Sequence, residues 1–94
     1  MPAYWIANVQ ATDVEAYKRY ATVATGVIEA HGGRFLVRAG RHVQLEGRDR
    51  ARNVVIEFPS LEAAEACYRS PEYQSALAQA KGALERDLVL VEGV

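Results

Sequence analysis

Apolar residues recur along this chain with two different spacings, and the changes between them divide its 94 residues into short elements. Short runs rich in apolar, β-branched and aromatic residues are typical of strands. Such runs predict four strands, at Tyr4–Val9, Arg34–Ala39, Asn53–Phe58 and Leu88–Val91. A further stretch, His42–Leu45, is also expected to be extended, after a turn or bulge at Gly40.

Helical spacing replaces the strand pattern after the first strand. Thr12 and Glu15 have the arrangement of a capping box, in which each side chain satisfies a free N–H group at the start of a helix. Glycine readily adopts the left-handed conformation that closes a helix, so we expect this one to end at His31-Gly32-Gly33. The apolar stripe expected on the helix comprises Val14, Tyr17, Ala21, Ala24 and Ile28.

Two more helix starts follow the third strand. Ser60 and Ser70 are both suited to capping a helix, and Pro71 occupies a first position that favours proline. The expected apolar positions are Leu61, Ala64 and Tyr68 on the first helix, and Tyr73, Leu77, Ala80 and Leu84 on the second, which Gly82 should weaken.

The resulting order of elements is strand, helix, strand, strand, helix pair, strand. We see no internal repeat or linker, so residues 1–94 are expected to form a single domain. Right-handed crossovers then favour an α+β fold of the ferredoxin-like βαββαβ type, a four-stranded antiparallel sheet with its helices on one face.

The second face of this sheet is expected to be partly apolar. Because side chains alternate along a strand, Tyr4, Ile6, Leu36 and Val55 should lie on the face away from the helices. A contiguous apolar patch of this kind is unusual on a monomer. We therefore expect a homodimer in which two sheets pack face to face, with a monomer whose open face is only somewhat apolar as the alternative.

Polar residues on the same open face are the leading candidates for a site. We expect Glu57 to project there beside Asn8 and Arg38, so that a carboxylate and a cation meet in a partly closed dimer interior. Such a pair can act as an acid, a base or a clamp for a small organic ligand. The alternatives are an ion pair that only fixes the dimer register, or an acid in water.

His31 is a further candidate for ligand binding because imidazoles often bind ligands and exchange protons in proteins, although a histidine at a helix end also complements the helix dipole. His42 has no acidic partner evident in sequence. Haem or metal binding through either histidine is a weak alternative, so we expect no metal site and no cofactor. Cys67 and Tyr73 are both expected to pack in the core.

Charge and cysteine content narrow the classes of partner. The net charge is −1, which gives no general attraction to nucleic acid or membranes, although residues 34–52 carry six of the eleven basic side chains. The lone cysteine and the lack of a signal-like or membrane-spanning segment indicate a cytoplasmic protein. No phosphate-binding loop, CxxC or GxSxG motif is present.

An ordered set of short motifs resembles the DUF1330 family, a domain of unknown function. The motifs run over almost the whole chain: Tyr17-x-x-Tyr20, His31-Gly32-Gly33-Arg34, Glu46-Gly47, Ile56-Glu57-Phe58-Pro59-Ser60, Ser70-Pro71-Glu72-Tyr73-Gln74 and Val91-Glu92-Gly93. The resemblance implies a ferredoxin-like fold in the dimeric α/β-barrel superfamily, which includes small monooxygenases, isomerases and haem-handling proteins.

The resemblance implies no specific activity, because the family has none assigned. It is compatible with a protein that binds a small organic molecule, or with a cofactor-free oxygenase or isomerase. Family members often carry an arginine in the helix after Ser-Pro-Glu-Tyr-Gln, where this chain has Ala80 with Lys81 beside it. A ligand role for that arginine therefore does not transfer to this chain.

Overall fold

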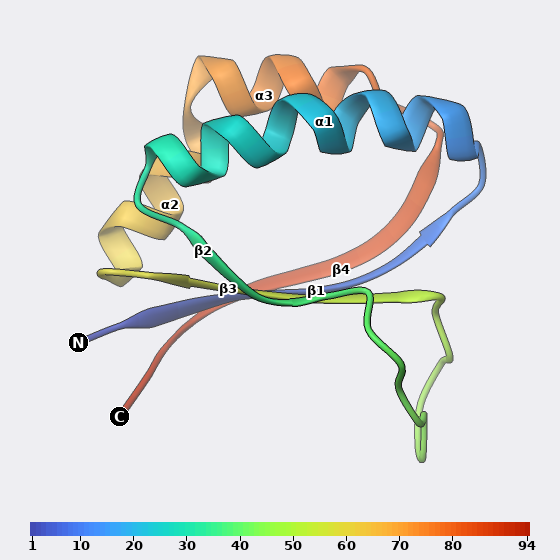
Figure 1. Cartoon of the computed structure of the whole chain (residues 1–94), viewed down its shortest axis with the longest axis horizontal. Helices are drawn as coiled ribbons and strands as arrows, with labels where there is room; N and C mark the ends of the chain where they lie inside the picture. Colours follow the sequence, from blue (N-terminus) through green and yellow to red (C-terminus); the bar gives the residue numbers. More distant parts are fainter.

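The computed structural model describes all 94 residues and has the order of elements predicted for a ferredoxin-like domain (Figure 1). The three helices lie on one side of a four-stranded sheet, whose other face they leave uncovered, so the predicted α+β architecture is confirmed. The elements are β1 (Ala3–Ala11), α1 (Val14–Ala30), β2 (Arg34–Arg38), β3 (Arg52–Phe58), α2 (Leu61–Arg69), α3 (Pro71–Ala78) and β4 (Leu84–Glu92).

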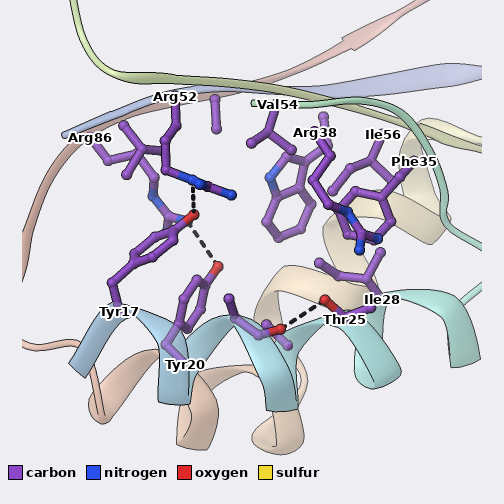
Figure 2. A pocket seen from close by; sticks show the side chains of 15 residues that line it. Tyr17, Tyr20, Thr25, Ile28, Phe35, Arg38, Arg52, Val54, Ile56 and Arg86 are labelled. Carbon is purple, nitrogen blue, oxygen red and sulfur yellow. Dashed lines mark hydrogen bonds between the residues drawn. The ribbon is translucent and has the colours of Figure 1, made fainter. Parts of the chain in front are cut away.

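The sheet has the order β2-β3-β1-β4, and each pair of neighbours is antiparallel. In the centre, Trp5 on β1 lies opposite Ile56 on β3 and Leu90 on β4. Residues on β1 alternate between buried and half-buried, as expected where only one face of a sheet is covered by helices. A cleft lined by side chains remains between α1 and the sheet (Figure 2).

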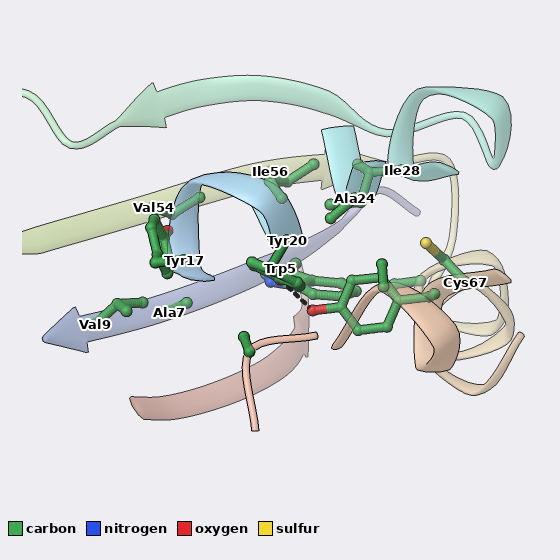
Figure 3. Packing of buried hydrophobic residues seen from close by; sticks show 14 of the residues in the cluster. Trp5, Ala7, Val9, Tyr17, Tyr20, Ala24, Ile28, Val54, Ile56 and Cys67 are labelled. Atoms are coloured by element: carbon green, nitrogen blue, oxygen red, sulfur yellow. Dashed lines mark hydrogen bonds between the residues drawn. The ribbon is translucent and has the colours of Figure 1, made fainter. Parts of the chain in front are cut away.

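An aromatic cluster fills the space between the sheet and the two C-terminal helices (Figure 3). Trp5 is its centre: its ring lies 5.1 Å from that of Tyr73, 5.9 Å from that of Tyr68 and 6.0 Å from that of Phe58, measured between ring centroids. These separations are typical of favourable aromatic pairs. Cys67 is fully buried nearby, so the predicted core positions of Cys67 and Tyr73 are confirmed.

The first helix begins one residue later than predicted. Asp13 is its cap and accepts a hydrogen bond from the N–H of Ala16, whereas the Thr12 hydroxyl donates to the carbonyl of Gly82. The predicted stripe is correspondingly wrong at its start, because Val14 faces solvent. The buried residues of α1 are Ala16, Tyr17, Tyr20, Ala24 and Ile28. The predicted caps Ser60 and Ser70 are confirmed.

A bulge in β2 reverses one predicted side-chain direction. Phe35 pairs with Ile56 and Val37 pairs with Val55, so Leu36 is an extra residue without a partner on β3. The register beyond the bulge pairs Arg38 with Val54, whose side chain faces the helices. The prediction that Arg38 shares the open face with Glu57 is therefore wrong.

Two connections also differ from the sequence-based expectation. The predicted extended segment His42–Leu45 is not a strand but part of a long connection, which begins where Ala39 takes the left-handed conformation (φ 56°). At the other end of the fold, α3 stops at Ala78 and Gly82 adopts φ 76°. The chain then turns, and Leu84 opens β4 opposite Ala11 instead of extending the helix.

No helix is both long enough and apolar enough to cross a membrane.

Burial of Cys67 predicts a distinct alkaline loss of stability. Burial raises the pKa of its thiol from 9.0 to about 11, so the folded protein resists ionisation that the unfolded chain undergoes readily. The resulting stability is complete below pH 9 and is lost between pH 9 and about pH 11, by roughly 2–3 kcal/mol in all.

Urea denaturation at a series of pH values checks this prediction. Cys67→Ala should lower the free energy of unfolding at pH 7 by about 1 kcal/mol. It should also flatten the decline between pH 9 and pH 11 relative to the wild type. Equal slopes for the two proteins would show that Cys67 does not titrate in this way.

A candidate anion-binding cleft between the first helix and the sheet

The cleft between α1 and the inner face of the sheet encloses about 470 Å³ of unfilled space when its open mouth is counted, and its narrow interior suits a small or flat ligand. Its walls are mainly apolar and aromatic, as in many sites for small organic molecules. The lining residues are Trp5, Ala7, Val9, Tyr17, Tyr20, Ala21, Ala24, Thr25, Ile28, Phe35, Arg38, Arg52, Val54, Ile56 and Arg86.

Three arginines from three different strands reach this mainly apolar space: Arg38 from β2, Arg52 from β3 and Arg86 from β4 (Figure 2). No aspartate or glutamate lines the cleft. None of the three guanidinium groups takes part in any of the chain's ion pairs. The cleft therefore carries positive charge that no carboxylate of the chain neutralises.

Arg86 is held in place by two tyrosine hydroxyls. Its Nη1 donates to the Tyr20 oxygen at 3.1 Å and to the Tyr73 oxygen at 3.2 Å, and the two tyrosine oxygens lie 2.5 Å apart. Burial opposes the charge of Arg86, but the two tyrosines outweigh it, so the pKa of Arg86 lies above its ordinary value. Arg86 is consequently a fixed cation at any physiological pH.

The same network orients a proton donor toward the cleft. Burial, followed by the influence of Tyr20, raises the pKa of Tyr73 well above its ordinary range, so Tyr73 keeps its proton. When Tyr73 donates to Tyr20, the Tyr20 proton is left free to point at a ligand. The Nε and Nη2 groups of Arg86 are not engaged by the tyrosines and are also available.

The guanidinium groups of Arg38 and Arg52 lie over aromatic rings. Arg52 donates from Nε to the Tyr17 hydroxyl at 3.2 Å, and its guanidinium carbon lies 5.1 Å from the centroid of the Tyr17 ring. The Arg38 guanidinium carbon lies 3.7 Å from the centroid of the Phe35 ring. Both contacts are in the range of cation–π interactions, which position an arginine without neutralising it.

These features together suit an anion with an apolar body. A carboxylate or phenolate among arginines gains charge-assisted hydrogen bonds, which are about twice as strong as neutral ones. An aromatic or aliphatic body would lie against Trp5, Val54 and Ile56.

The predicted site residues do not converge on this cleft, except for Arg38. Glu57 lies on the open face, where it pairs with Arg34 at 2.9 Å and accepts a hydrogen bond from the Tyr4 hydroxyl at 3.4 Å. The predicted pairing of Glu57 with Arg38 is thus wrong, because Arg34 is the β2 residue opposite Glu57 and the bulge turns Arg38 to the helix side. Asn8 donates to Asn53 at 2.6 Å on the open face.

The histidines lie elsewhere. His31 caps α1 and its Nδ1 lies 2.9 Å from the carbonyl of Val27, whereas His42 lies 3.0 Å from Asp49 in the β2–β3 connection. Nowhere in the chain do three metal-ligating side chains gather. Ligand binding by Asn8, Glu57 or His31 stays a prediction.

Sequence reasoning missed Arg52 and Arg86, although a signal for both was present. In the pattern Leu84-x-Arg86-x-Leu88, the arginine occupies the position of an inward-facing residue on a strand. Arg52 precedes Val54 and Ile56 with the same spacing. A cation in phase with the apolar face of a strand is therefore the feature that would have located the cleft.

Comparison with known families decides where this chain belongs. The profile of the family described as a domain of unknown function, DUF1330, matches residues 2–94. The chain belongs to the DUF1330 family. No curated protein matches the chain.

Solved structures share the fold at low sequence identity. A protein of unknown function from Rhodopseudomonas palustris is 20% identical, with a TM-score of 0.81 over 99% of this chain and 82% of that one. A dimeric ferredoxin-like protein of unknown function from Thermobifida fusca is 19% identical, with a TM-score of 0.66 over 99% and 92%. SnoaB, a cofactor-independent oxygenase from Streptomyces nogalater, is 11% identical, with a TM-score of 0.65 over 99% and 93%.

Proposed function

We propose that this DUF1330 protein binds a small organic anion, a carboxylate or phenolate with an apolar or aromatic body, in the cleft between α1 and the sheet. The observation that carries the proposal is the set of three arginines that line an otherwise mainly apolar cleft without any carboxylate. Arg38 is exposed, but Arg52 and Arg86 are half-buried, and a cation partly withdrawn from water is costly unless it is paired or fully hydrogen-bonded. A bound anion would supply the missing partner.

We also propose that the protein works as a homodimer, in the cytoplasm, with the open sheet faces of two copies in contact. The open face carries exposed valines, including Val89 and Val91 on β4 and Val37 on β2. Ile6 lies opposite Val55 and Val89 in the register of the sheet, which makes this apolar surface continuous across three strands. The described dimers among proteins of the same fold support the proposal.

A second proposal is that the cleft belongs to a cofactor-free oxygenase- or isomerase-like enzyme. The observation that favours it is the Tyr20, Tyr73 and Arg86 network. An enolisable ligand that loses a proton from the carbon beside its carbonyl develops negative charge on oxygen. Donors fixed beforehand around that oxygen stabilise the transition state. Because no carboxylate or imidazole lines the cleft, water entering through its open mouth would take the proton from the carbon, and an isomerase would return it from that water to a different atom of the ligand.

The first prediction tests anion binding by calorimetric titration with phenylacetate, salicylate and cinnamate. Phenylacetate should bind at least about tenfold more tightly than neutral phenylacetamide, because only the acid forms charge-assisted bonds. Arg86→Met should weaken binding of the acids by about tenfold or more, and Arg52→Met should also weaken it. Arg19→Met, on the exposed surface of α1, is the matched control and should leave binding unchanged.

Failure of all three acids to bind better than their neutral amides would contradict the anion-binding proposal. So would equal affinities of the wild type and the folded Arg86→Met and Arg52→Met variants.

The second prediction tests the enzymatic use of the cleft. The conversion of phenylpyruvate between its enol and keto forms can be followed by ultraviolet absorbance. Tyr20→Phe should lower the rate at saturation by about a hundredfold, while changing the affinity for phenylacetate by less than about threefold, because the hydroxyl would act mainly on the developing charge. A wild-type rate equal to that of buffer would rule out this isomerisation and leave binding intact.

The third prediction tests the dimer by sedimentation equilibrium. Val89→Lys places a charge within the proposed contact, opposite Ile6, and should raise the dimer dissociation constant by about tenfold or more. Val23→Lys, at a comparably exposed valine on α1, should not change it. A wild-type chain that stays monomeric at high micromolar concentration would sink the dimer proposal.

A further inference from the structure

The connection between β2 and β3, residues 39–51, projects from the sheet on the side away from the helices (Figure 1). We call it the arm. It therefore lies on the same side as the open sheet face.

Polar contacts tie the base of the arm to one end of the open face. Arg48 pairs with Glu85 at 2.5 Å, and Arg50 pairs with Asp87, both of which are outward-facing residues of β4. The backbone N–H of Ala51 donates to the side chain of Gln10 on β1. These contacts neutralise part of the basic segment and fix the arm to strands beyond its own.

The outer part of the arm has its own internal bonds. His42 lies 3.0 Å from Asp49 across the arm, and the Gln44 side chain donates to the carbonyl of Glu46. Gly47 adopts φ 82°, a conformation that favours glycine and turns the chain back toward β3. The arm is thus a bonded loop with a defined path rather than a simple linker.

Two large apolar side chains of this loop nevertheless lie in solvent. Val43 is 80% exposed and Leu45 is 86% exposed, more than any other large hydrophobic residue except the C-terminal Val94. Neither belongs to the hydrophobic core or to the side chains packed against it. The arm is thus held by ion pairs but presents an apolar surface, Val43 and Leu45, that no other part of the chain covers.

The size of the open face indicates which partner covers it. Strands of nine, five, seven and nine residues give the sheet a footprint on the order of 500 Å². A stable dimer usually buries about 800 Å² per partner. The arm covers part of this face at the polar end, and its exposed apolar side chains add surface on the same side that a second copy can bury.

We propose that the arm is a clasp for a second copy of this chain, on which Val43 and Leu45 pack once the two open faces meet. In a two-fold dimer the contact forms twice, because each arm reaches the other copy. The proposal rests on the proposed homodimer and adds the element that supplies much of its apolar contact.

The test compares two double variants by sedimentation equilibrium. Val43→Ser with Leu45→Ser should raise the dimer dissociation constant by about tenfold or more, because each protomer loses the apolar contacts of two side chains. Val14→Ser with Val23→Ser is the matched control, since these valines are exposed on α1, away from the open face. The control should leave the dissociation constant within about twofold of the wild type.

A fluorescent reporter gives a second readout that does not depend on weakening the dimer. Cys67 is fully buried, so a thiol introduced by Leu45→Cys can be labelled selectively with an environment-sensitive dye. The emission of dye at position 45 should shift to the blue as the protein concentration rises through the dimer dissociation constant. Dye attached to a Val23→Cys variant should not respond.

The possible outcomes distinguish the role of the arm from that of the sheet faces and of the cleft. A dimer that is unaffected by the arm variant, with no shift of the dye at position 45, means that the sheets associate without the arm and overturns the clasp. A monomeric wild type overturns both clasp and dimer. Neither result alters the affinity for phenylacetate, which reports on the cleft of each protomer alone.

Discussion

A guanidinium group held by two tyrosine hydroxyls is the constraint around which the helix side of this fold is organised. Arg86 comes from β4, Tyr20 from α1 and Tyr73 from α3, so one cluster joins three elements that are far apart in sequence. Tyr73 also packs edge-on against Trp5, which connects the polar cluster to the aromatic core. A change in the packing of α3 would therefore shift Tyr73 and with it the position of the Arg86 guanidinium group in the cleft.

Satisfying this cation with hydroxyls rather than with a carboxylate has a chemical consequence. An aspartate would neutralise Arg86 and close the site to other anions. Phenols accept hydrogen bonds but keep their protons at neutral pH, as the raised pKa of Tyr73 ensures. The charge of Arg86 is stabilised by its surroundings and stays available to a ligand. Arg52 likewise donates to a tyrosine hydroxyl, that of Tyr17, and keeps its charge available.

The sequence predicted the fold well because its signals are local. Two serine caps and the paired glycines at the end of the first helix mark where helices start and stop, and each was found within a residue or so of its predicted place. Glycine at position 33 has a further reason, since a Cβ there would come within 2.5 Å of Ile28. The boundary between α3 and β4 was harder to predict, because the left-handed conformation of Gly82 decides whether Leu84 continues a helix or opens a strand.

The site was harder to predict because it depends on register. One unpaired residue at Leu36 moves Arg38 to the helix side, whereas Arg34 precedes the bulge and lies opposite Glu57. The residues of β2 contain no signal that predicts such a bulge. A shift of one position in the register exchanges the two faces of a strand. The predicted cation and carboxylate are both real, but the sheet separates them.

Because of this separation, the two faces of the sheet differ in their charge balance. On the open face, acids and cations neutralise one another: Glu57 with Arg34, and the acids of β4 with the base of the arm. On the helix face, the cations have no acid and stand among aromatic rings. An open face with balanced charge and exposed valines suits contact with a second protein surface, whereas a face partly covered by helices and carrying unbalanced charge suits a small ion.

The proposed roles also fit the small size of the chain. A domain of fewer than a hundred residues has a thin margin of stability, and three cations that share one cleft reduce it further by repelling one another. An anion in the cleft removes that repulsion, and a second copy covers apolar surface that a single copy leaves in water. Both proposed partners would stabilise the native state by binding to it and not to the unfolded chain, the ligand from one side of the sheet and the second copy from the other.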